Sequence, residues 1–178
     1  MGGINMAKHE EVKNGVIFPV GEKNEAYAQY FVGQSYLKTL IADPKVNVGV
    51  GNVTFEPGCR NNWHIHRDGY QILLVTGGEG WFQQEGERAQ LLKAGDVIVI
   101  HDGVKHWHGA TKDSWFQHIA ITAGTPEWLE PVDDEAAFPT VFGALANALH
   151  KATGKRFYEA SFIKQLGNIR ETNQIKCG

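Results

Sequence analysis

The sequence predicts an all-β barrel followed by a helical C-terminal extension. From about Val46 to Thr122, short runs of β-branched and aromatic residues are separated by turns that contain glycine, a spacing typical of barrels and sandwiches. After Pro126 an acidic stretch begins at Asp133, and apolar residues then recur at helical spacing. A chain of 178 residues is long enough for one domain with a sizeable core, plus extensions.

The expected organisation has three parts. Residues 1–15 form a flexible segment or are left over from cloning, residues 16–125 form the barrel, and residues 126–178 form a partly helical extension. Strands are expected near residues 16–18, 36–41, 46–56, 70–76, 80–83, 90–92, 97–100 and 115–122, about eight in all. Helices are expected near residues 133–149 and 157–166.

Composition excludes several functional classes. The 17 basic and 20 acidic residues give a net charge of −3 and form no basic run, which argues against nucleic-acid binding. No apolar stretch approaches the roughly 20 residues that span a bilayer, and the N-terminus lacks a secretory signal. Cys59 and Cys177 lie far apart and suggest no disulfide framework. We therefore expect a cytoplasmic protein that does not bind a membrane, with Cys59 in a structural role.

Histidines with strand spacing predict a metal site in the barrel. His64 and His66 are two residues apart, so in an extended segment both side chains point to the same face. Gln71 follows on the next predicted strand, and His106 and His108 repeat the two-residue spacing. Three β segments can thus bring nitrogen and oxygen donors to one point inside the barrel.

Two longer motifs contain these residues. The stretch 58–71, together with Gly77, follows the pattern G-x5-HxH-x4-E-x5/6-G with Gln71 in place of glutamate, and the stretch 95–106 follows G-x5-PxG-x2-H with His101 in place of proline. Paired in this way, the motifs resemble those of the cupin superfamily over residues 46–122. The resemblance implies a cupin jelly-roll β-barrel, with the C-terminal helical extension outside it.

A narrower resemblance concerns the metal. Residues 53–58 and 105–110, with glutamine at position 71, are similar to a cupin subgroup that includes manganese-dependent bacterial hydroxynitrile lyases and the cupin part of carboxymuconolactone decarboxylase-like proteins. It implies one divalent transition metal per chain, manganese first and iron, zinc, nickel or cobalt as alternatives. It also implies a homodimer or homotetramer with a small-molecule substrate. The implied ligands are His64, His66, Gln71 and His106.

Gln71 is the distinctive residue of this ligand set. With every protein ligand neutral, a bound ion would keep its full 2+ charge, which favours Lewis-acid chemistry over dioxygen activation. His108 is the candidate general base or acid, or else a residue that orients a ligand by a hydrogen bond. His118 is a second polar group in the pocket or a packed core histidine, and His101 is a surface residue.

Three functions remain open from the sequence. The leading one is a metal-dependent lyase or isomerase that acts on a small oxygenated substrate, with hydroxynitrile lyase activity as one form of it. The second is a metal-dependent dioxygenase, for which oxygen consumption dependent on Fe(II) would be the evidence. The third is a non-catalytic cupin that binds a small ligand tightly without turnover.

Overall fold

A computed structural model describes residues 12–13 and 15–137 of the chain. Contacts divide the chain into two units, Met1–Ala137 and Phe138–Gly178. The helices expected beyond residue 137 lie outside the described residues, so they and the three-part division stay predictions. The described part of the chain includes no helix that is long and apolar enough to cross a membrane.

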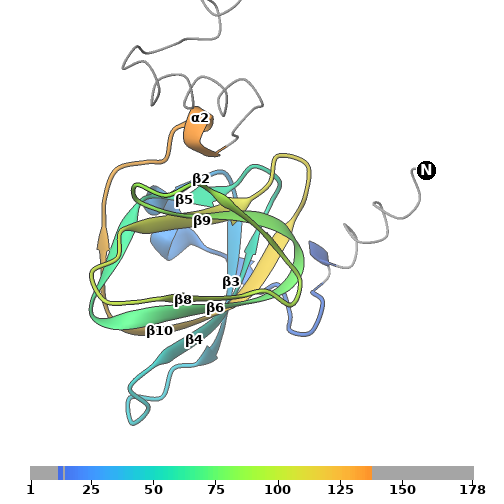
Figure 1. The fold of residues 1–178 in the computed structure, drawn as a ribbon. Helices are drawn as coiled ribbons and strands as arrows, with labels where there is room; N and C mark the ends of the chain where they lie inside the picture. The colour runs from blue at the N-terminus through green and yellow to red at the C-terminus, as the bar shows by residue number, and fades with distance from the viewer. Residues whose placement is uncertain (1–11, 14, 138–178) are drawn as a thin grey trace, which may run out of the picture. The chain divides into compact units, whose positions relative to one another are not determined.

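Among the described residues of the first unit, nearly all of the regular elements are strands (Figure 1). In chain order, the described elements are β1 (Glu22–Lys23), the 3-10 helix η1 (Glu25–Tyr30), β2 (Phe31–Val32), β3 (Ser35–Ile41), β4 (Gly49–Phe55), β5 (Arg60–Asn61), β6 (His64–Gln84), β7 (Gln90–Lys93), β8 (Val97–Ile100), β9 (His106–Ala110), β10 (Phe116–Trp128) and α2 (Asp134–Ala137). The all-β fold class is confirmed, and α2 begins where the acidic residues predicted the start of a helix.

The described strands form one curled sheet in the order β1-β3-β4-β10-β6-β9-β5-β2, with β7 and β8 also paired to β6. β6 is 21 residues long and pairs with two strands in succession. Its residues 71–74 pair with β8, and its residues 79–82 pair with β7. Gly78 lies between these two segments with a φ of 73°. A side chain there would collide with the carbonyl oxygen of Trp115, so the bend requires glycine.

The barrel interior follows the two-residue period of the strands. On β6, Leu73 and Val75 are buried while Ile72 and Leu74, on the opposite face, are partly exposed. Each fully buried large apolar side chain stabilises the fold by roughly 1.5–3 kcal/mol. The buried cluster consists of Phe55, Cys59, Leu73, Val75, Phe82, Leu92, Ile100, Ala110 and Phe116.

The strand predicted near residues 16–18 is wrong, because these residues form a bend. Side-chain amides, rather than a neighbouring strand, bond this segment: Asn52 Nδ2 donates to the Pro19 carbonyl oxygen at 2.9 Å, and the Val16 N–H donates to Gln117 Oε1 at 3.4 Å. Proline has no N–H to offer a ladder, and short apolar runs look alike in a strand and in a packed loop.

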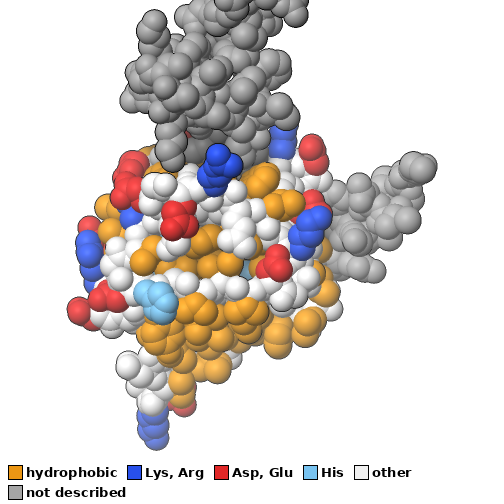
Figure 2. Space-filling model, in the orientation of Figure 1, with side chains coloured by type: hydrophobic (Ala, Val, Ile, Leu, Met, Phe, Trp, Pro, Cys, Tyr) orange, Lys and Arg blue, Asp and Glu red, His pale blue; other side chains and the backbone are white. Residues whose placement is uncertain are grey.

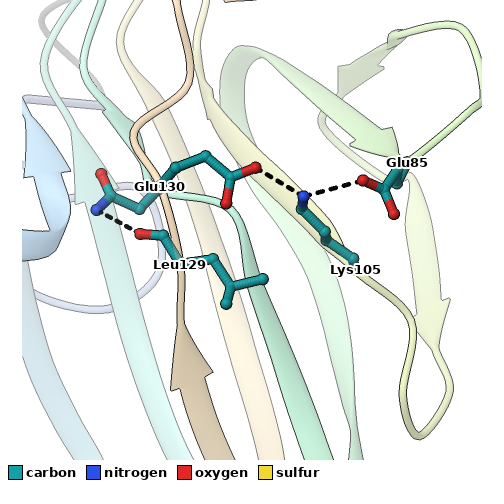
Figure 3. A network of polar contacts seen from close by, with 5 residues as sticks. Glu85, Lys105, Leu129 and Glu130 are labelled. Carbon is teal, nitrogen blue, oxygen red and sulfur yellow. Dashed lines mark hydrogen bonds and ion pairs between the residues drawn. The ribbon is translucent and has the colours of Figure 1, made fainter.

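β10 continues to Trp128, beyond the residue 125 at which we expected the barrel to end. Its last residues pair with the start of β6, so that Trp128 lies opposite His64. Glu130, which follows β10, forms an ion pair with Lys105 of the barrel: Lys105 Nζ lies 2.6 Å from Glu130 Oε1. Lys105 Nζ also lies 2.9 Å from Glu85 Oε1 (Figure 3). The extension thus begins with a segment that completes the wall around the histidines.

Candidate metal centre

Three of the predicted ligands meet inside the barrel. His64 and His66 come from β6 and His106 from β9, and one nitrogen from each lies within 4.8 Å of the others. β6 and β9 bring them together through the pair His64 and His106. All three side chains are buried. Such a group could hold a metal ion, as the histidine spacing predicted.

The hydrogen bonds of His64 and His106 leave one nitrogen of each ring with a lone pair that could bind a metal. His64 Nδ1 donates to the Asn62 carbonyl oxygen at 3.0 Å, and His106 Nδ1 donates to the Val104 carbonyl oxygen at 2.9 Å. Neither nitrogen of His66 has a partner among the described residues. Burial lowers the pKa of His106 to about 4 and that of His64 well below its ordinary value. The rings are therefore neutral near pH 7, and each Nε2 of His64 and His106 carries a lone pair.

Gln71 faces the same point. Its Nε2 donates to Thr122 Oγ1 at 3.3 Å, which leaves Oε1 3.2 Å from Nε2 of His106. Because both of these atoms are acceptors in a neutral site, no hydrogen bond can join them. A cation between them would turn that repulsion into attraction. The four predicted residues therefore fit a divalent transition metal in the chemistry of their donors.

His108 lies next to this centre and is held by a residue that the sequence did not suggest. Asn61 Oδ1 accepts a hydrogen bond from the His108 backbone N–H at 2.9 Å, while Asn61 Nδ2 lies 3.0 Å from Nδ1 and 3.2 Å from Nε2 of the His108 ring. Nδ2 can only donate, so one ring nitrogen accepts and the other carries the proton of a neutral ring. Burial is the largest cause that lowers the pKa of His108 well below its ordinary value.

A cavity of about 390 Å³ extends from three of the predicted metal ligands, His64, His66 and Gln71, to His118. His118 is fully buried, and neither of its ring nitrogens has a hydrogen-bond partner among the described residues. Its ring centroid lies 4.8 Å from that of His108 and 5.6 Å from that of Phe55. Burial lowers its pKa to about 3. A buried polar group without a partner costs about 1–3 kcal/mol, which is large for a merely packed residue.

The cavity wall is aromatic, aliphatic and amide-bearing, and none of its described lining residues is Lys, Arg, Asp or Glu. Trp128 forms part of it, 4.7 Å from His64 and stacked on Tyr30 at 4.7 Å. Trp128 was not predicted from the sequence, because it follows Pro126, where the strand pattern was expected to stop. A wall without charged side chains favours a neutral ligand.

Two candidate residues lie away from the cavity. His101 is exposed, as predicted for a residue that replaces a turn proline. Cys59 is buried in the apolar core, and burial raises the pKa of its thiol to about 12. The thiol therefore stays protonated at neutral pH, which agrees with the structural role expected for it.

The depressed pKa of His118 predicts acid destabilisation. Below pH 6.5 the unfolded chain binds a proton at this residue that the folded chain excludes until about pH 3. The free energy of unfolding should then fall with falling pH by about 1.4 kcal/mol per pH unit on account of His118. Urea denaturation of the metal-free protein at several pH values measures this dependence. In His118→Phe, the free energy of unfolding should fall by about 1.4 kcal/mol less per pH unit than in the wild-type protein. His101→Gln, which removes an exposed histidine away from the cavity, is the matched control.

Comparisons with known proteins agree with this geometry. The family described as "Cupin domain" matches residues 51–121. An (R)-mandelonitrile lyase of Granulicella tundricola is 40% identical over 113 residues, which are 61% of this chain and 86% of that protein. A cupin-like protein from Thermotoga maritima is 41% identical with a TM-score of 0.64, covering 68% of this chain and 96% of the other.

A more distant structure shows the fold alone. A cupin 2 conserved barrel domain protein from Rhodopseudomonas palustris is 15% identical with a TM-score of 0.52, covering 65% of this chain and 78% of the other. The match to the Thermotoga protein extends over nearly the full length of that protein. With both motifs, the barrel and these relatives in agreement, the chain belongs to the cupin family.

Proposed function

We propose that this cupin is a metal-dependent lyase that acts on a small, neutral hydroxy or carbonyl compound. The observation that carries the proposal is a centre of neutral donors that opens into a cavity without charged lining side chains. A divalent metal held there would supply a Lewis acid for the oxygen of the substrate. The relative named (R)-mandelonitrile lyase supports cyanohydrin cleavage as the reaction to test first.

In this proposal His108 transfers the proton. Cleavage of mandelonitrile breaks the bond between the carbinol and nitrile carbons, whose electron pair leaves with cyanide, while the hydroxyl loses its proton and becomes the carbonyl of benzaldehyde. His108 can take that proton by giving up the hydrogen bond from Asn61, and can return it to cyanide to form hydrogen cyanide. Burial keeps the ring neutral and able to accept it.

Release of benzaldehyde from racemic mandelonitrile, followed by absorbance, tests the activity. His108→Ala should lower kcat roughly 10²- to 10⁴-fold, the usual contribution of general acid–base catalysis, while leaving the metal content unchanged. His101→Gln, on the surface, should retain the wild-type rate. Full activity of His108→Ala would show that another group moves the proton. No release by the wild-type, metal-loaded protein would exclude this substrate.

We further propose that Gln71 is the fourth protein ligand and that manganese is the native ion. The support for Gln71 is the position of Oε1 against His106 Nε2, with the amide nitrogen fixed by Thr122. Manganese rests on the subgroup resemblance, since these donors also suit iron, cobalt, nickel and zinc.

Elemental analysis should find about one divalent ion per chain, and its identity is read from the same measurement. Gln71→Leu, which keeps the side-chain size, should weaken metal affinity at least as much as the roughly 10- to 100-fold that loss of an outer-shell partner costs. His64→Ala should abolish stoichiometric metal binding. Gln71→Glu should restore the metal affinity that Gln71→Leu loses. Unchanged affinity in Gln71→Leu would mean that only the three histidines bind the ion.

We also propose that the chain forms a homodimer or homotetramer through the outer face of β6 and β8. Val97 and Val99 are 57% and 52% exposed on β8 and pair with Leu74 and Ile72 of β6. Figure 2 shows hydrophobic side chains gathered continuously over one face of the described region. A second copy of the same face would bury them, as isologous interfaces do.

Light scattering on the purified protein tests the oligomer. The double variant Val97→Lys, Val99→Lys should reduce the mass to about half, because an isologous interface joins two copies and charges would be desolvated in it. Val46→Lys adds an exposed charge outside β6 and β8 and should leave the mass unchanged. A monomeric wild-type protein would contradict the proposal.

A further inference from the structure

We propose that the His118 end of the cavity is a second ligand subsite, in which His118 hydrogen-bonds a polar group of the substrate other than the one near the candidate metal ligands. The inference rests on the proposed function and adds to it the class of substrate. That class is a neutral molecule with two hydrogen-bonding groups separated by an apolar body.

His118 carries the first part of the argument. It comes from the inner face of β10, lines the cavity, and is fully buried with both ring nitrogens unpartnered among the described residues. A neutral imidazole offers one donor and one acceptor, so it can bond a hydroxyl, carbonyl or amide of a ligand. His108 differs from it, because the side chain of Asn61 already contacts the His108 ring.

His118 lies at one polar end of the cavity, and the candidate metal ligands lie at the other. The His118 ring contacts those of His108, Phe55 and Phe116, and the His108 ring lies 5.7 Å from that of His64. Among the described residues, no ring contact joins His118 directly to His64, His66 or His106, whereas the His108 ring contacts those of His118, His64 and His106. A ligand with an apolar body between two polar groups can reach both ends.

Space for that body lies along β4. Across the β4–β10 pair, the inner residues opposite Thr122, Ala120 and His118 are Gly49, Gly51 and Val53. Neither glycine has a positive φ, so the backbone does not require glycine at these positions. Gly49 is exposed, and a Cβ there would meet only the Thr122 carbonyl oxygen, at 3.9 Å, whereas a Cβ at Gly51 would lie 2.9 Å from Leu37 Cδ1. The open space is therefore at Gly49. Glycine within a strand is consistent with the close approach of a ligand.

The absence of charged side chains from the described cavity wall favours neutral over charged ligand groups. No described Lys, Arg, Asp or Glu lines the cavity, so a carboxylate or ammonium group at the His118 end would lose its hydration without gaining an ion pair. His118 itself stays neutral because of its burial. A neutral hydroxyl, carbonyl or amide is the group that this end can accept.

Calorimetric binding of four neutral probes to the metal-loaded full-length protein tests the subsite. Benzyl alcohol has one polar group, and 2-, 3- and 4-hydroxybenzyl alcohol add a second at different positions on the same body. At least one isomer should bind more tightly than benzyl alcohol. His118→Phe should remove that advantage, about five- to tenfold in Kd for one hydrogen bond, and leave benzyl alcohol unchanged. His118→Asn, which keeps a donor and an acceptor, should retain part of it.

An equal effect of His118→Phe on all four probes, or no effect, would overturn the hydrogen-bonding role. Gly49→Val gives an independent test that spares the histidines: it should weaken all four probes at least fivefold with an unchanged melting temperature, and unchanged affinity would overturn the placement of the apolar body. Binding is measured without turnover. The subsite is therefore supported or overturned whether or not mandelonitrile is cleaved.

Discussion

The antiparallel pairing of β10 with β6 is the constraint on which the rest of the structure depends. Trp128 lies opposite His64 after a register shift between Ala123 and Thr125, and the register before that shift places Thr122 opposite Gln71. Because side chains alternate along a strand, the same register directs Gln71, Leu73 and Val75 inward together. A slip of one residue would turn the glutamine and the apolar core outward at once. The core and the candidate metal centre are therefore set by one ladder of hydrogen bonds.

Desolvation of the histidines is the physical property that connects the fold to its chemistry. Burial lowers the pKa of His64, His106, His108 and His118, so the barrel holds neutral imidazoles whose lone pairs are ready for a metal or a proton. Partners differ from ring to ring. Backbone carbonyls fix His64 and His106, Asn61 contacts His108, and His118 has no hydrogen-bond partner among the described residues. Chemically identical side chains thus become suited to different tasks.

The sequence was informative wherever a rule of spacing applied. The two-residue period put His64 with His66 and His106 with His108, and the two motifs predicted the barrel and the approach of β6 to β9. The same reasoning failed near residues 16–18, because a short apolar run fits a strand or a packed loop equally well. It also ended the barrel early at Pro126, although β10 tolerates a proline there and continues to Trp128.

By itself, then, the sequence determined the all-β class, the cupin barrel and the set of candidate ligands, because these depend on local periodicity and on residue types at fixed separations. Only the tertiary structure decided which polar atoms lack partners and which residues surround them. Asn61 against His108, Thr122 against Gln71 and Trp128 against His64 join segments between 47 and 64 positions apart. Such contacts depend on strand register, which no local pattern encodes. The unpartnered nitrogens of His118 and the space above Gly49 likewise exist only once the strands are paired.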